Sequence, residues 1–178
     1  MIKKFKSFID RSKITYTCLY DLGLKKFKVQ SDGKVDVMGD VDITYRRLEI
    51  LPIKFGNISG NFDCSNNRLR DLKNCPEFVD GIFNCGSNYI ENIDNLPKKI
   101  GQHLYLNNNK ITSIKNLRNC DIGGEIYLKS NYITSLEGSP KKVYGDFDIS
   151  WNQVENLENC PESISGSLLA YSNIINSL

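Results

Sequence analysis

One apolar position recurs along this chain with a nearly constant period, and that period constrains the fold more than any other feature. The position is occupied by Val41, Phe62, Phe83, Leu104, Ile126, Phe147 and Leu168. The successive steps are 21, 21, 21, 22, 21 and 21 residues. A unit this short cannot bury its own apolar face, so stacked units must share one continuous core. The sequence therefore predicts a solenoid of about seven repeats of 21–22 residues.

Each repeat follows the pattern apolar-x-apolar-x-x-Asn-x-apolar-x-x-apolar. The first two apolar residues point to one side of a β-strand, because strand side chains alternate. The asparagine follows the strand, and we predict that its amide bonds backbone groups of its own coil and of the neighbouring coil. It is found at Asn67, Asn88, Asn109, Asn131, Asn152 and Asn173, and only the first repeat breaks the pattern, with Arg46.

The second half of each repeat returns the chain to the next strand. An apolar residue ends it, at Ile58, Val79, Ile100, Ile122, Val143 and Ile164. Proline recurs at one place in these segments, at Pro76, Pro97, Pro140 and Pro161, and cannot continue a helix; the short period also leaves little room for one. We therefore expect an α/β-type solenoid that is mostly β, with a parallel concave sheet and short turns or 3₁₀ pieces on the convex side.

The N-terminal residues 1–34 are expected to form a cap on the solenoid of residues 35–178. Apolar residues Ile2, Phe5, Phe8 and Ile9 have helical spacing. A second short helix is expected over residues 15–22, ended by Gly23, and a hairpin over 27–29 and 35–37. Residues 1–34 carry a net charge of +6, whereas the other 144 carry −4. A lysine-rich cap surface is the favoured interpretation, and contact with nucleic acid or a membrane surface is the alternative.

The chain has 178 residues with no apolar run long enough for a membrane span and no secretory signal pattern. Of its six cysteines, Cys64, Cys85, Cys75 and Cys160 occupy positions where other repeats carry apolar residues. We interpret them as small buried hydrophobes with free thiols. That interpretation predicts a reducing, cytoplasmic location.

The repeat pattern resembles the short form of the leucine-rich repeat found in proteins of tailed bacteriophages. The phrases that carry the resemblance are GDVDITYRRLEILPIKF, GNFDCSNNRLRDLKNCPEFV and GGEIYLKSNYITSLEGSPKKV, and it covers about residues 34–178. The resemblance implies a right-handed, parallel-strand solenoid that binds other proteins, with no catalytic residue and no cofactor. Four departures stand out: Gln102 for glycine, Arg46 for asparagine, Arg118 for proline, and one extra residue near Cys120, where we expect a local bulge.

Enzymatic sites are not favoured by the residues present. Histidine occurs once, at His103, and no glycine-rich phosphate loop precedes a helix. Asp146 and Asp148 alternate on an open sheet, without the apolar pocket that would shift a pKa. Asp40, Asp42 and Asp63 could together hold a cation, but we interpret them as surface acids. No metal site is predicted.

The outward strand positions are more informative, because large aromatic side chains on a solvated sheet indicate a contact surface. We predict a protein-binding face with Tyr105, Tyr127 and Trp151 as anchors and with His103 and Lys129 giving polar specificity. Tyr89, Tyr132 and Tyr171 extend it. The alternative is that the tyrosines only stack along the sheet and stabilise it.

The last repeat is unusually apolar at outward positions, with Leu169 and Ile174, and ends at Leu178. We predict self-association through these residues, or cover by a partner; a frayed end is the alternative. The sequence thus favours a phage protein that binds, and modulates or inhibits, a host protein. A self-associating structural protein and a nucleic-acid-binding protein are the alternatives.

Overall fold

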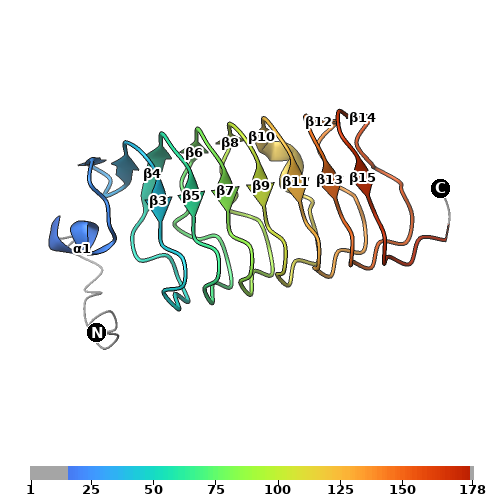
Figure 1. Ribbon diagram of the computed structural model, residues 1–178, viewed down its shortest axis with the longest axis horizontal. Coiled ribbons are helices and arrows are strands. Elements are labelled where there is room, and N and C mark those ends of the chain that lie inside the picture. Colours follow the sequence, from blue (N-terminus) through green and yellow to red (C-terminus); the bar gives the residue numbers. More distant parts are fainter. Residues whose placement is uncertain (1–15, 177–178) are drawn as a thin grey trace.

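The chain folds into a β-solenoid, a stack of short coils along one long axis (Figure 1). The structure is a computed structural model that describes residues 16–176, with side chains from residue 19 onwards. The only α-helix in that range, α1 (Tyr16–Asp21), lies at one end of the stack. None of the helices there is long and apolar enough to cross a membrane.

One sheet holds the first strand of every repeat, and all of its strands run parallel. Its strands are β3 (Val41–Asp42), β5 (Phe62–Asp63), β7 (Phe83–Asn84), β9 (Leu104–Tyr105), β11 (Ile126–Tyr127), β13 (Phe147–Asp148) and β15 (Leu168–Leu169). The register pairs each predicted inward residue with its equivalent one coil later, as in Phe62 opposite Phe83. The prediction of one aligned row and of a mostly β, parallel solenoid is confirmed. Six turns lie between the first and last of the seven strands.

The return half of the repeat contains the expected turns and one 3₁₀ helix, but it also contains short strands, which the sequence interpretation did not predict. These strands form a second sheet of β1 (Phe27–Val29), β2 (Val35–Val37), β4 (Phe55–Ile58), β6 (Phe78–Val79), β8 (Lys99–Ile100) and β10 (Asp121–Ile122), and a separate pair, β12 (Lys142–Val143) and β14 (Ser163–Ile164). The closing apolar residue of each repeat lies on these strands. Stacking makes the equivalent backbones of neighbouring coils pair there, which no single repeat reveals.

The extra residue near Cys120 produces the one 3₁₀ helix among the described residues, η2 (Leu117–Asn119). Leu117 remains fully buried, and β10 still pairs with β8 in register. The extra residue is therefore taken up by a 3₁₀ helix in the return loop rather than by the expected bulge, and it does not disturb the stack.

The core is continuous from the first coil to the last. Phe62 and Phe83 stack with ring centroids 5.6 Å apart, and Phe55 meets Phe62 edge-on at 4.9 Å. All three rings are buried. Full burial of each such side chain contributes about 1.5–3 kcal/mol, so this aromatic row is a major source of stability.

The asparagines form the predicted ladder. The Nδ2 of Asn109 donates to the carbonyls of Leu106 in its own coil and of Cys85 in the previous coil, at 3.1 and 3.0 Å. Its Oδ1 accepts from the N–H of Ile90 at 3.0 Å. Asn67, Asn88, Asn131, Asn152 and Asn173 repeat this geometry. Each amide thus satisfies backbone groups that would cost about 1–3 kcal/mol apiece if buried unpaired.

Arg46 replaces asparagine in the first coil, because the described residues hold no earlier coil whose backbone an asparagine there could bond. Its guanidinium donates instead to the carbonyls of Asp21 and Leu22, at 3.1 and 3.4 Å, where α1 ends. Its backbone N–H donates to Asn67 Oδ1 and so joins the ladder. This departure from the repeat links the solenoid to the helix before it.

The helix and hairpin predicted before the solenoid are present in the described part. Gly23 has a φ of +85° and ends α1, and β1 pairs antiparallel with β2. Leu19, Leu22 and Leu24 are buried in the common core. The predicted first helix, with Ile2, Phe5, Phe8 and Ile9, lies outside the described residues.

The glycine before most strands gives room for a second ladder. Asn61 Oδ1 accepts from the N–H of Ile82 at 2.8 Å, and a Cβ on Gly81 would overlap that oxygen. Ile82, the equivalent of Asn61 one coil later, has no side-chain hydrogen-bond acceptor. The following coil has Gln102 at the position of the glycine. From the second coil onwards these glycines therefore reflect close approach of the preceding coil.

The expectation of free thiols is wrong for Cys64 and Cys85, which form a disulfide between adjacent coils with their Cα atoms 5.1 Å apart. Both hold the second inward position of their strands, and parallel pairing brings equivalent positions within bonding range. Cys75, Cys120 and Cys160 are free. Burial raises the pKa of Cys120 to about 12, so its thiol is inert at neutral pH.

Candidate functional surface

The outward side chains of the seven-stranded sheet form what we call the open face. On its first coils these are carboxylates, and each is engaged locally. Asp40 Oδ1 accepts from the N–H of Asn61 at 2.7 Å, and Asp42 Oδ1 accepts from the backbone and hydroxyl of Thr44. Asp63 accepts from Ser65 N–H and Asn84 Nδ2. Among residues 19–176 no group of three metal-ligating side chains is close enough to hold a cation.

The middle of the open face carries a cluster of four side chains at β9 and β11. Tyr105 and Tyr127 lie on these strands, and His103 and Glu125 directly precede them. The tyrosine rings stack 4.9 Å apart with planes 18° from parallel. His103 Nδ1 accepts from Glu125 N–H at 3.1 Å and lies 3.4 Å from the Glu125 carboxylate. Since that nitrogen accepts a backbone hydrogen bond, the proton of the neutral ring is on Nε2.

Both tyrosines of this cluster are half-buried, and their ionisation is disfavoured. Burial, and then the negative charge of Glu125, raises the pKa of Tyr105. The same causes, with a hydrogen bond to the Glu125 carboxylate, raise the pKa of Tyr127 to about 12. The two predicted anchors, Tyr105 and Tyr127, thus stack on each other along the sheet, as the alternative interpretation of the sequence expected.

The side chains of Lys129 and Tyr171 contact each other on the open face, although they come from coils two strands apart. The Lys129 ammonium lies 5.8 Å from the centroid of the Tyr171 ring, a cation–π contact. Between them Ser150 is fully buried, and its hydroxyl has no hydrogen-bond partner in the described chain. Asp148 is also buried and accepts from the N–H of Ser150 at 2.9 Å. These predicted contact residues therefore also cover polar groups of the sheet.

The third residue after each strand of this sheet has a positive φ in all seven coils. These residues are Tyr45, Asn66, Ser87, Asn108, Ser130, Trp151 and Ser172, with φ from 54° to 58°. Asparagine adopts this left-handed conformation readily, whereas a bulky residue is strained there. Trp151 has this left-handed conformation, and its side chain is 56% exposed.

Four of the predicted aromatic contact residues lie in or near this column and are more exposed than the tyrosine pair in the middle of the sheet. Tyr89, Tyr132, Trp151 and Tyr171 are each about half exposed. We call these four residues the aromatic edge. Of the eight predicted contact residues, four thus form the aromatic edge and two form the half-buried pair Tyr105–Tyr127. The other two contact neighbouring side chains: His103 contacts Glu125, and Lys129 contacts Tyr171.

Tyr45 is a candidate that the sequence interpretation missed. It is 76% exposed and has a φ of 54° in the first coil. The signal was available, because asparagine and serine dominate this column and an aromatic residue there departs from the left-handed preference. The backbone conformation was needed to recognise it.

At the far end of the stack, side chains that are buried in other coils become accessible. Leu168, Ala170 and Ile175 are only partly buried, and Ile174 is exposed. Leu169 is partly exposed as well. Leu178, the third residue predicted for self-association, lies outside the described residues.

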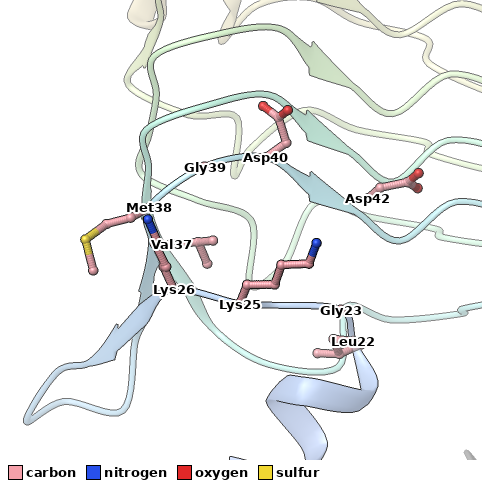
Figure 2. Close-up of a pocket in the computed structure, with 9 residues that line it drawn as sticks. All are labelled: Leu22, Gly23, Lys25, Lys26, Val37, Met38, Gly39, Asp40 and Asp42. Carbon is pink, nitrogen blue, oxygen red and sulfur yellow. The ribbon is translucent and has the colours of Figure 1, made fainter.

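A hollow of about 510 Å³ lies at the other end, where α1 and the hairpin meet β3. Figure 2 shows Lys25 and Lys26 together with Asp40 and Asp42 around it, and Leu22 and Val37 as apolar lining. Charges of both signs line it, and the two carboxylates already accept hydrogen bonds. This hollow therefore favours neither an anionic nor a cationic ligand.

No family model, curated protein or solved structure matches the chain. The functional argument therefore depends on the open face and the aromatic edge themselves.

Proposed function

We propose that the protein is a non-enzymatic binding module that contacts another protein through its aromatic edge and the adjoining open face. Trp151 is the observation that carries this proposal. A tryptophan in the left-handed conformation costs the fold stability that an asparagine would not, and half of its surface faces solvent. Aromatic side chains dominate the binding energy of protein interfaces. A partner that covers Trp151 would account for its retention.

We further propose that the solenoid is a leucine-rich repeat of the bacteriophage type and that its partner is a host protein, which it modulates or inhibits. The sequence resemblance is the support for the family, the phage origin and the host partner. In this proposal α1 and the hairpin cap the first coil. A cytoplasmic location stays a prediction, and the Cys64–Cys85 disulfide argues against a strongly reducing compartment.

The test is affinity capture from a bacterial lysate with the intact protein and with the double variant Trp151→Asn/Tyr132→Asn. We expect the intact protein to retain a specific protein that the double variant loses. The matched control is Lys73→Asn, an exposed change away from the aromatic edge, which should retain the partner. Equal capture by all three proteins would refute the proposal, provided that circular dichroism shows each variant to be folded.

Self-association is a second candidate, favoured by the accessible apolar side chains of the last coil. Strand β15 pairs with β13 only, so its other edge has backbone groups free to pair within the described chain. A second copy could cover that edge together with Leu169 and Ile174. Sedimentation equilibrium should then show a dimer that Leu169→Asp/Ile174→Asp dissociates; a monomer at all concentrations would exclude this candidate.

A further inference from the structure

A small polar hollow lies on the open face between the ends of β5, β7 and β9. It has a volume of about 220 Å³. Its lining residues all come from three successive coils: Ser65, Asn66, Asn84, Gly86, Ser87, Tyr105 and Asn107. Such a volume is below that of pockets for drug-sized ligands, so the hollow fits a single small ring or side chain.

Gly86 creates this hollow, and the backbone does not require glycine there. Its equivalents in the neighbouring coils are Ser65 and Asn107, which do carry side chains. Gly86 is not among the residues with positive φ. A Cβ there would lie 3.1 Å from Asn107 Oδ1 and 3.3 Å from Asn84 Oδ1, both at the ends of side chains. Unlike Gly81, whose Cβ would meet the backbone of the preceding coil, Gly86 serves to leave space.

Three of the side chains around the space are not engaged within the described chain, whereas Asn66 Nδ2 donates to Ser65 Oγ at 3.0 Å. In the part of the chain that the structure describes, the Asn107 amide and the hydroxyls of Ser87 and Tyr105 have no hydrogen-bond partner. Asn84 is held in place, since its Oδ1 accepts from Gly86 N–H and its Nδ2 donates to Asp63, each at 3.0 Å. The Tyr105 ring is fixed by its stacking on Tyr127. Asn84 and the Tyr105 ring are therefore ordered before any ligand binds, which lowers the entropic cost of binding.

The chemistry of this lining selects the ligand class. No charged side chain lines the hollow, and the nearby Asp63 carboxylate is satisfied by Ser65 and Asn84. An ion would thus lose its hydration without gaining an opposite charge. Amides and hydroxyls that both donate and accept, beside one aromatic ring, match a ring bearing several hydroxyl groups. We propose that the hollow binds one pyranose ring of a neutral carbohydrate, a function beyond the protein contact proposed above.

The test titrates the full-length, ¹⁵N-labelled protein with the methyl glycosides of glucose, galactose, mannose and N-acetylglucosamine. At least one should cause saturable shifts of the Gly86 and Ser87 amide signals, with a Kd of about 1–10 mM for so small a ligand. Gly86→Ser fills the hollow and should weaken binding about tenfold or more, a loss of about 1.4 kcal/mol. Asn107→Ala, which removes an amide without filling space, should also weaken it.

The matched control is Ser130→Asn, outside the hollow, which should bind as the intact protein does. The proposal is overturned if none of the four glycosides gives saturable shifts, or if Gly86→Ser binds equally well. A trisaccharide that binds more tightly than its monosaccharide identifies a glycan chain as the ligand, and equal affinity identifies a free sugar. Trp151 is not part of the hollow, so this result is independent of the partner-capture experiment.

Discussion

Some positions of the solenoid hold a residue type that the repeat structure does not require, and Trp151 is the clearest example. Its column is left-handed in every coil, and asparagine holds the same position in Asn66 and Asn108. The fold alone would favour asparagine or serine at this point. A residue kept against the preference of its own backbone indicates selection for something other than stability.

Trp151→Asn should therefore stabilise the protein. Relief of the left-handed strain is expected to raise the free energy of unfolding by about 1 kcal/mol, measured by urea denaturation. Tyr132→Asn is the control, because Tyr132 is equally exposed but has an ordinary φ, and it should change stability by less than about 0.5 kcal/mol. Equal effects of the two substitutions would contradict the argument from strain.

Tyr127 gives a prediction for alkaline pH. Its pKa is raised to about 12 in the folded protein, by burial and by Glu125, above its ordinary value of 10. The folded state therefore holds the phenolic proton more tightly than the unfolded state does. The stabilisation is complete below pH 10 and is lost as the pH rises towards 12. Tyrosinate absorbance should show a tyrosine that titrates near pH 12 and is absent in Tyr127→Phe, in addition to the raised titration of Tyr105; identical titration curves would refute this.

At the scale of the coil, neighbouring repeats decide what each position tolerates. A glycine before the strand is needed where the previous coil sends an acceptor towards it, as Asn61 does towards Gly81. Gln102 is tolerated at the glycine position because the previous coil has Ile82, which lacks a side-chain acceptor, at the position of Asn61. The glycine and the acceptor one repeat earlier thus form one structural unit.

Gly81→Ala should destabilise the protein by about 2 kcal/mol, because the new methyl group would overlap Asn61 Oδ1 and the backbone of Gly60. Gln102→Ala, at the equivalent position one coil later, should cost less than about 0.5 kcal/mol. Thermal unfolding of both variants provides the comparison. Similar losses would mean that the glycine is kept for another reason.

The Cys64–Cys85 disulfide joins two adjacent coils across a sequence separation of 21 residues. Closing a loop of this size stabilises the folded state by about 3 kcal/mol in the chain-entropy model. Alkylation of the unfolded, unreduced protein should leave Cys64 and Cys85 unmodified while Cys75, Cys120 and Cys160 react. Cys64→Ala/Cys85→Ala should lower the unfolding temperature, and reaction of Cys64 and Cys85 without reductant would show that the bond does not form.

At the scale of the whole molecule, each coil contacts only its neighbours, so protection should follow position along the stack. Leu104 and Leu106 donate their N–H groups to the next coil at 2.9 Å. Leu168 in β15 and Ala170 directly after it hold the equivalent positions, and β15 pairs on one side only.

Hydrogen exchange should accordingly be slow for Leu104 and Leu106 and fast for Leu168 and Ala170 at low protein concentration. Mass spectrometry of the exchanged peptides measures this difference. Exchange at β15 that slows as the protein concentration rises would support self-association. Uniform protection along the chain would contradict nearest-neighbour stability.

The sequence by itself determined the periodic coil, the inward row and the asparagine ladder, because each follows from residues of one repeat and the need to bury its apolar side. It also located Trp151, Tyr105 and Tyr127 on the outside. Only the tertiary structure decided which of these are accessible, since exposure, the second sheet, the disulfide and the hollow at Gly86 depend on side chains and backbone angles one coil away. A repeat pattern fixes which way a side chain points, whereas its neighbours in the adjacent coils fix what it can still contact.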